Sequence, residues 1–522
     1  MMHMAYTVRH TDKKSGTVYI YECESYWDKE KKAPRNRQRC IGKEDPKTRE
    51  IVPCRPKRAT KDPWAGVTAS CKMAGGTFLL EHLDRKLGVS RAVEKCFGQL
   101  SPKIMSVVYY LAQKGQPLSR CETWSGGHLH PYGDVITSQD MSELLDLIGP
   151  DEQLKFFSLW LAKICESEYL CYDITSVSSY ASNIPYVKYG YNRDRESLPQ
   201  INVAMLYGQK SMMPAYFRRM PGNISDVATL ATTVRSLDFL GARKLHFVLD
   251  RGFYSKANVD RMFEARAKVT VSLPSGLKWV EKLVDGHVDR VKLPTDYLQL
   301  SENEILFAAT ELYSWGDERH RCYVHIFYNP VKAANDIEDM TRRLLALKAK
   351  VEAGERLGER EKELASRFLV VKDTPKRGRR VSFNEKELGD FQKKYAGFFC
   401  VLSNKFKDAK DAIECYRRRD MVENSFDDLK NALDMNRIRV HTARRMDARL
   451  FIQFLALIFM NEIRKTTMED KVLRHLTVRE TMDEMETLCR ITYANRRGRL
   501  LTEMNKIQRR IVDVFGVKLP EN

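Results

Sequence analysis

Two aspartates each close a short apolar segment that is typical of a buried strand. Asp173 lies in Tyr172-Asp-Ile-Thr-Ser176, and Asp250 lies in Val248-Leu-Asp-Arg-Gly-Phe-Tyr254. Carboxylates at the carboxyl ends of adjacent strands point into one crevice of an open α/β sheet. A divalent cation relieves their repulsion, and hard oxygen ligands suit Mg²⁺ or Mn²⁺. Taken alone, each aspartate is more often a residue that caps the turn after a strand.

A third acidic residue, Glu423, lies among spaced polar residues. Tyr416, Arg419, Glu423 and Lys430 stand at offsets 0, 3, 7 and 14. On a continuous helix these positions occupy one arc of about 60°, so one face would present a carboxylate, two cations and a phenol. A scissile phosphate requires a metal-binding carboxylate between positive groups. The alternative is an exposed helix face with intrahelical ion pairs.

The elements that must position these residues alternate between strand and helix over residues 168–274. Three β-prone runs come first, followed by a helix, a strand, a helix and a strand. This order predicts an α/β ribonuclease-H-like catalytic core. A β-rich insertion with charged helical stretches interrupts the core, and helices dominate the C-terminus.

The pattern divides the chain into six expected segments. They are a small β-rich basic module (1–62), a helical domain that either binds DNA ends or is a spacer (75–165), the first part of the core (166–274), the insertion (275–395), the second part of the core with the signature helix (396–465), and a helical C-terminal region (466–522).

The net charge of the chain indicates the kind of binding partner. The 522 residues carry a net charge of +19, which favours a polyanion, either nucleic acid or an anionic membrane surface. The longest apolar run, Leu450–Met460, contains Gln453, is too short to span a bilayer, and predicts a buried helix. The N-terminus has no apolar signal region, so we expect a cytoplasmic protein. The twelve cysteines form no Cys-x-x-Cys pair, which indicates reduced thiols.

Three basic segments could contact DNA or be solvated surface. Trp27–Arg39 predicts either a DNA-contacting hairpin or a solvated loop. For Lys376–Arg380 the two alternatives are contact with DNA phosphates and solvated surface. In the third segment phosphate contact is the favoured reading. Its arginines are Arg437, Arg439, Arg444 and Arg445.

These motifs carry a family resemblance that covers about residues 165–465. The pattern Tyr-x2-Arg-x3-Glu-x6-Lys resembles the signature of the insertion-sequence-four superfamily of bacterial DDE transposases. Asp-Ile-Thr-Ser at 173 and Asp-Arg-Gly-Phe at 250 look like its two aspartate motifs, and the segments starting at Tyr189, Leu198 and Pro221 are also similar. The N-terminal Glu24–Glu30 segment looks like one branch of the family.

The resemblance implies roles for individual residues. Asp173, Asp250 and Glu423 would be the catalytic triad and would hold two Mg²⁺ or Mn²⁺ ions. Tyr416, Arg419 and Lys430 would contact DNA near the cleavage site. The family's β-rich insertion lies between the second aspartate and the glutamate, where residues 275–395 sit.

The implied activity is cut-and-paste DNA transposition. The enzyme would bind the terminal inverted repeats of a mobile element, cut the DNA and join the ends to target DNA in the nucleoid of a bacterial cell. In related transposases the freed 3′-hydroxyl attacks the opposite strand to give a hairpin. Trp315, beside Tyr313, or Trp279 would be the residue that stacks on a flipped base, although such residues more often belong to the core.

Two other functions stay open at this point. One is a ribonuclease-H-like nuclease without strand joining, which would use the same carboxylates. The other is a non-catalytic DNA-binding protein derived from a transposase, which predicts the loss of an acidic residue, whereas all three are present. Synapsis of two ends predicts a homodimer on DNA. Leu450–Met460 or the C-terminal helices could form its interface, with core packing preferred for the former.

Overall fold

The computed structural model of the protein describes residues 5–28, 32–54, 68–164, 168–181, 183–192, 196–240, 245–301, 304–374, 378–419, 426, 430, 433, 437–438, 440, 442–493 and 498–520. The chain divides into two units. The smaller comprises Met1–Ala69 with Tyr493–Arg497, and the larger comprises Ser70–Thr492 with Gly498–Asn522.

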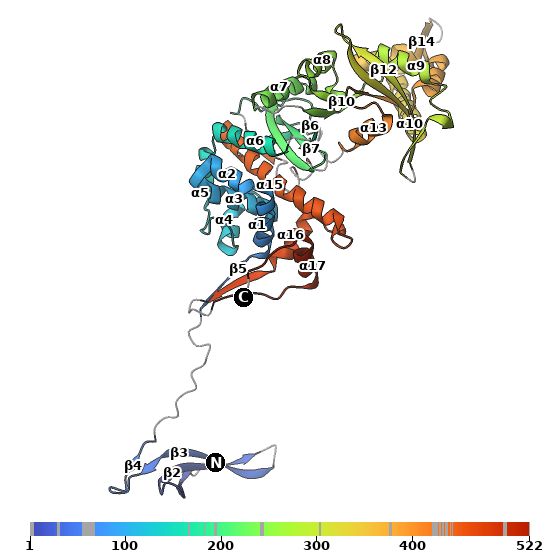
Figure 1. Ribbon diagram of the computed structural model, residues 1–522. Helices are drawn as coiled ribbons and strands as arrows, with labels where there is room; N and C mark the ends of the chain where they lie inside the picture. The colour runs from blue at the N-terminus through green and yellow to red at the C-terminus, as the bar shows by residue number, and fades with distance from the viewer. Residues whose placement is uncertain are drawn as a thin grey trace. The chain divides into compact units, whose positions relative to one another are not determined.

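The smaller unit is built on a four-stranded antiparallel sheet (Figure 1). Only Ile20 and Cys23 are buried hydrophobic residues among its described strands. The sheet therefore has two largely exposed faces. Its strands, in spatial order, are β1 (Ala5–Thr11), β2 (Val18–Asp28), β3 (Ala33–Glu44) and β4 (Ile51–Val52).

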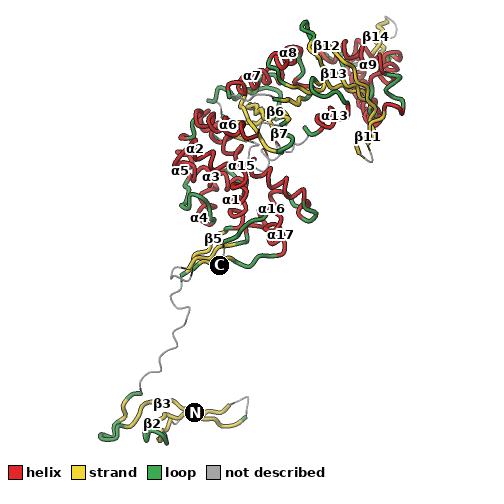
Figure 2. The backbone as a smooth tube through the Cα atoms, in the orientation of Figure 1, coloured by secondary structure: helices red, strands yellow, loops and turns green. Residues whose placement is uncertain are grey.

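The larger unit is organised around a long mixed sheet (Figure 2). β6, β9 and β10 are parallel neighbours, and β7 and β8 continue the sheet antiparallel to β6 and β7, respectively. The central strands are buried along nearly their whole length, as expected of strands covered on both faces. The strands, in spatial order, are β11 (Tyr297–Ser301), β12 (Glu304–Trp315), β13 (His320–Tyr328), β16 (Phe398–Ser403), β10 (Lys268–Leu273), β9 (His246–Leu249), β6 (Tyr169–Ser179), β7 (Gln200–Gly208) and β8 (Met213–Pro221), with β17 (Arg437–Ile438) on β6.

The mixed α/β class predicted from the sequence is confirmed. Helices α7 (Asp226–Phe239) and α8 (Lys256–Glu264) connect β8 to β9 and β9 to β10. The α8 helix begins where the Ser255 side chain accepts a hydrogen bond from the backbone N–H of Asn258, an ordinary N-cap.

The strands of the expected insertion belong to the main sheet. β13 pairs with β16, which pairs with β10, so β11–β13 extend the sheet that carries the aspartates. The helical part has a hydrophobic cluster of its own, which includes Leu347 and Phe368. Its elements are α10 (Pro330–Glu352), α11 (Glu359–Phe368), β14 (Leu369–Thr374), β15 (Gly378–Phe383) and α12 (Glu385–Asp390), with α9 (Lys278–His287) preceding β11.

Helix α15 (Ala443–Glu469) lies against both the sheet and the N-terminal helices. Every residue of Leu450–Met460 is buried, as the apolar run predicts. None of the described helices is both long and apolar enough to cross a membrane. The surrounding elements are α1 (Gly75–Leu87), α2 (Val89–Phe97), α3 (Ser101–Lys114), α4 (Cys121–Gly127), α5 (Ser138–Leu147), α6 (Pro150–Ile164), α16 (Val478–Glu486), α17 (Lys506–Phe515) and a small sheet of β5 (Ala69–Met73), β18 (Cys489–Tyr493) and β19 (Arg499–Leu501).

Replacing Phe451 of α15 by alanine should lower the free energy of unfolding of the larger unit by about 3–5 kcal/mol. The ring is fully buried and packs against Phe97, Phe156 and Phe157. Denaturant unfolding followed by tryptophan fluorescence measures the change. Met468→Ala, at a position 60% exposed on the same helix, should change stability by less than about 0.5 kcal/mol. Equal effects of the two substitutions would contradict the central role of this helix.

Candidate active site

The backbone register of two parallel strands sets Asp173 beside Asp250. Tyr172 of β6 pairs with Leu249 of β9, and the next residue on each strand is an aspartate. Asp250 keeps an extended backbone, with φ −73° and ψ 162°. Neighbouring strands lie about 4.8 Å apart and registered residues face the same side. The two carboxylates therefore sit next to each other at the point where β9 ends.

Asp250 is bound by two residues of the signature segment. The Tyr416 hydroxyl donates to Asp250 Oδ1 over 3.0 Å, and Arg419 Nη1 lies 2.8 Å from the same oxygen. Burial alone would raise the pKa of Asp250. The Arg419 charge, the backbone N–H of Arg251 and the Tyr416 hydroxyl outweigh burial and hold that pKa below its usual value. Asp250 is thus a carboxylate at neutral pH.

Helix α13 (Ala409–Arg417) ends within the signature, so Tyr416 and Arg419 do not share one continuous helix as expected. In a continuing helix the Arg419 N–H would bond to the carbonyl of Cys415. Here Gln209 Nε2 donates to that carbonyl over 2.6 Å, and the Arg419 N–H bonds to Tyr416 O over 3.2 Å. The chain turns, and both side chains converge on Asp250.

Gln209 is a positioning residue that the sequence analysis missed. It is 4% exposed, follows β7 directly, and also donates from Nε2 to Cys171 Sγ over 3.0 Å, two residues before Asp173. One amide therefore joins the last turn of α13 to the strand that carries Asp173. A polar residue after a strand gives no sequence signal that separates such a role from an ordinary turn.

Tyr416 is held as a hydrogen-bond donor. Burial, together with the neighbouring Asp250 charge, raises the pKa of its phenol to about 12. The hydroxyl therefore keeps its proton at physiological pH. Arg419 lies beside it, with its guanidinium carbon 5.4 Å from the centre of the Tyr416 ring.

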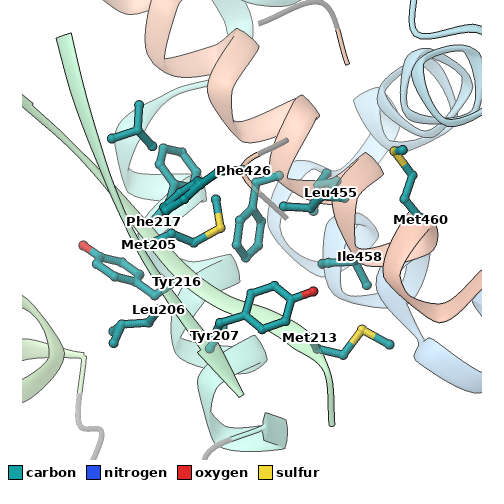
Figure 3. Close-up of a cluster of buried hydrophobic side chains, with 14 of the residues drawn as sticks. Met205, Leu206, Tyr207, Met213, Tyr216, Phe217, Phe426, Leu455, Ile458 and Met460 are labelled. Atoms are coloured by element: carbon teal, nitrogen blue, oxygen red, sulfur yellow. The ribbon is translucent and has the colours of Figure 1, made fainter. Parts of the chain in front are cut away.

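Glu423 lies outside the described residues, but described residues on both sides of it are anchored. Arg419 pairs with Asp250, and Phe426 is buried in the main core. Figure 3 shows Phe426 in a cluster with Met205 and Leu455. Met205 of β7 is the cross-strand partner of Asp173. Further along, Lys430 is buried.

The described side chains supply part of a metal site. No group of three or more His, Cys, Asp or Glu residues able to hold a metal ion occurs among the residues that the structure describes. Asp173 and Asp250 do provide adjacent carboxylate oxygens, which is the donor type that Mg²⁺ and Mn²⁺ prefer. The two aspartates thus fit a divalent cation that needs a further ligand.

The arginines expected to grip DNA have different surroundings. Arg437 lies in β17, which pairs with Ser178 of β6, and Arg439 is outside the described residues. Arg444 lines a pocket between α6, β8 and α15. Arg445 pairs with Asp146 over 2.5 Å. A phosphate would have to compete with that carboxylate for Arg445.

Trp315 is a core residue in this structure. It is 5% exposed, its indole N–H donates to Asp260 over 2.7 Å, and Trp279 and Tyr313 pack around it. A base could stack on it only after this cluster opened. Of the Lys376–Arg380 segment, residues 376 and 377 are not described, and Arg379 pairs with Asp373.

A mixed sheet that aligns Asp173, within β6, with Asp250, which directly follows β9, is suited to metal-assisted phosphodiester chemistry. Residues 165–459, more than half of the chain, match the transposase DDE domain family. The protein therefore belongs to this family and is an enzyme of the DDE transposase class.

The chain is also similar to a solved structure, a cryo-EM structure of the piggyBac transposase synaptic complex with hairpin DNA. The match covers 79% of this chain and 70% of that chain, with 11% sequence identity and a TM-score of 0.33. A TM-score this low does not define a common fold. No curated protein matches the chain.

Replacing Gln209 by leucine should lower the free energy of unfolding by about 1–3 kcal/mol, because the Cys415 carbonyl would be left buried without its donor. Denaturant unfolding measures the loss. Gln139→Leu removes an exposed amide that bonds only Glu143 within α5 and should cost less than about 0.5 kcal/mol. A wild-type stability for Gln209→Leu would show that α13 is held by other contacts.

Proposed function

We propose that the protein is a cut-and-paste DNA transposase of the insertion-sequence-four type, with Asp173, Asp250 and Glu423 as its catalytic and metal-binding triad. The observation that carries the proposal is the register of β6 and β9, which sets the two aspartates side by side, with Tyr416 and Arg419 converging on Asp250. The strand order β8-β7-β6-β9-β10, with α7 between β8 and β9 and α8 between β9 and β10, supports a ribonuclease-H-like core.

Chain length supports the assignment of Glu423. Glu423 lies four positions after Arg419, which is fixed on Asp250. It lies three positions before Phe426, which is fixed in the core with Met205. Extended chain covers at most about 3.6 Å per residue, so these tethers reach about 14 Å and 11 Å. Chain length is therefore compatible with the proposed position of Glu423 beside the two aspartates.

The chemistry divides between ions and protein. Two bound divalent cations would activate a water against a phosphodiester and stabilise the leaving 3′ oxygen. Asp173, Asp250 and Glu423 would supply their oxygen ligands. Arg419 occupies Oδ1 of Asp250 in the structure, and we propose that it moves to the scissile phosphate when DNA enters. Tyr416 stays protonated and can donate to either partner.

The partner is double-stranded DNA, both the terminal inverted repeats of the element and the target. The charge of +19 supports this. Lys430 ends the signature, and Arg437, Arg439, Arg444 and Arg445 follow it closely enough to line the same DNA. Two element ends need two active sites, so we propose a homodimer in the synapsed state. The enzyme would work on the nucleoid in a bacterial cytoplasm.

Metal-dependent nicking of supercoiled DNA tests the triad. Asp173→Asn, Asp250→Asn and Glu423→Gln should each lower the Mn²⁺-dependent rate by roughly 1,000-fold, because each removes a ligand worth several kcal/mol in the transition state. Asp238→Asn, a change of the same kind on the exposed side of α7, should leave the rate unchanged. Wild-type activity in Glu423→Gln would remove the third member of the triad.

The runner-up, a nuclease without strand joining, uses the same carboxylates. An assay with a pre-cleaved end that carries a free 3′-hydroxyl separates the two functions. Joining of that end to a target duplex supports the transposase, whereas hydrolysis without joining supports the nuclease. A non-catalytic protein would show neither activity.

Arg419 should compete with a metal ion for Asp250. Arg419→Ala is expected to bind Mn²⁺ more tightly than the wild type when DNA is absent, and to cleave DNA more slowly because the phosphate loses a partner. Titration calorimetry with Mn²⁺ and the nicking assay measure the two effects. Arg418→Ala, at the exposed neighbouring position, is the control. Weaker Mn²⁺ binding in Arg419→Ala would reverse the proposed role.

A further inference from the structure

The basic segment near the N-terminus lies in the paired strands β2 and β3, called the ribbon. Among the described residues, β1 pairs with β2 over Val18–Glu24, and β4 pairs with β3 at Lys43 and Glu44. Within the same residues the rest of β3 has an open edge, and the ribbon is two strands wide where Ser25–Asp28 pairs with Ala33–Asn36. The described residues of this segment are strand and not loop, and nearly all of them are exposed to solvent.

Three arginines stand in a row on one face of this ribbon. Arg35, Arg37 and Arg39 alternate along β3, so their side chains point the same way, and all three are exposed. The described part of the chain offers none of them an ion pair. Opposite them on β2 lie Tyr26, Glu24 and Glu22.

The dimensions of the ribbon match the major groove of B-DNA. That groove is about 12 Å wide and admits a two-stranded ribbon with strands about 4.8 Å apart. Arg35 lies in the two-stranded part, whereas β1 adds a third strand beyond β2 opposite Arg37 and Arg39, so the ribbon would enter the groove by the open edge of β3. Side chains two residues apart on a strand are separated by about 6.8 Å. Base pairs rise by about 3.4 Å, so successive arginines would meet every second base pair. The row from Arg35 to Arg39 spans about five base pairs.

The chemistry of the face favours base contacts over phosphate contacts. Arginine donates two parallel hydrogen bonds to guanine O6 and N7, and glutamate accepts from cytosine N4. Glu22 and Glu24 lie opposite Arg39 and Arg37, so each pair offers a donor and an acceptor to one G·C pair. A surface that bound only phosphates would be weakened by carboxylates at these two positions.

We propose that the β2–β3 ribbon enters the major groove of duplex DNA and reads G·C base pairs through Arg35, Arg37 and Arg39. The inference rests on the proposed function, because it assigns the recognition of element ends to the smaller unit. It leaves cleavage to the larger one.

Binding by the full chain tests the ribbon. Duplexes selected by the protein from a random 24-base-pair pool, in buffer with EDTA to prevent cleavage, serve as the probe, and fluorescence anisotropy gives the dissociation constant. The R35A/R37A/R39A variant should bind the selected duplex roughly 100-fold more weakly or worse. K13A/K14A/K47A removes the same charge from exposed turns of the same unit and should weaken binding less than tenfold.

Two further measurements isolate base reading. Replacing guanine by 7-deazaguanine removes the N7 acceptor without changing the charge, and should weaken binding by the wild type but not by the triple alanine variant. R35K/R37K/R39K keeps the charge and the fold, and should retain binding to random DNA while losing preference for the selected duplex. Equal losses in R35A/R37A/R39A and K13A/K14A/K47A, or no effect of 7-deazaguanine on the wild type, would overturn the inference.

The same variants separate this inference from the proposed function. R35A/R37A/R39A should still nick plasmid DNA with Mn²⁺, because the aspartates lie in the other unit. Selective binding by a wild type that never nicks would support the ribbon and refute the catalytic proposal. Nicking by a wild type that selects no sequence would do the reverse.

Discussion

Repulsion between two neighbouring carboxylates is the constraint on which the site depends. The hydrogen bonds between β6 and β9 fix the register, and the register leaves Asp173 and Asp250 side by side at the point where β9 ends. In the structure the positive charge of Arg419 offsets that repulsion through its ion pair with Asp250. Tyr416 and Arg419 of the signature segment are thereby bound to Asp250.

A buried amide decides how that segment approaches the sheet. Gln209 donates a hydrogen bond to the Cys415 carbonyl, which would accept the next backbone hydrogen bond of a longer α13. The helix ends there, and the chain turns back to Asp250. Phe426 then returns the segment to the core, next to the strand that pairs with β6. Hydrogen bonding at Arg419 and apolar burial at Phe426 thus anchor the described residues on either side of Glu423.

The sequence carried the local features of this arrangement and lacked the long-range ones. The apolar runs before Asp173 and Asp250 predicted two strands, and Leu450–Met460 predicted a buried helix, since both depend on nearby residues. The expected strand end at Asp173 was wrong, because β6 continues to Ser179. Helical spacing predicted one continuous face from Tyr416 onward, because a partner such as Gln209, distant in sequence, is invisible to periodicity. Trp315 likewise gave no sign that Asp260 would bind its indole.

The sheet continues from β9 through β10 and β16 into β13 and β12 without a break. The insertion is therefore joined to the catalytic edge by ladders of backbone hydrogen bonds, with no flexible tether between them. A sheet resists bending far more than a linker does, so a displacement of the β12–β13 hairpin would move the rest of the sheet with it. Whatever the hairpin touches is kept at a set distance from Asp250.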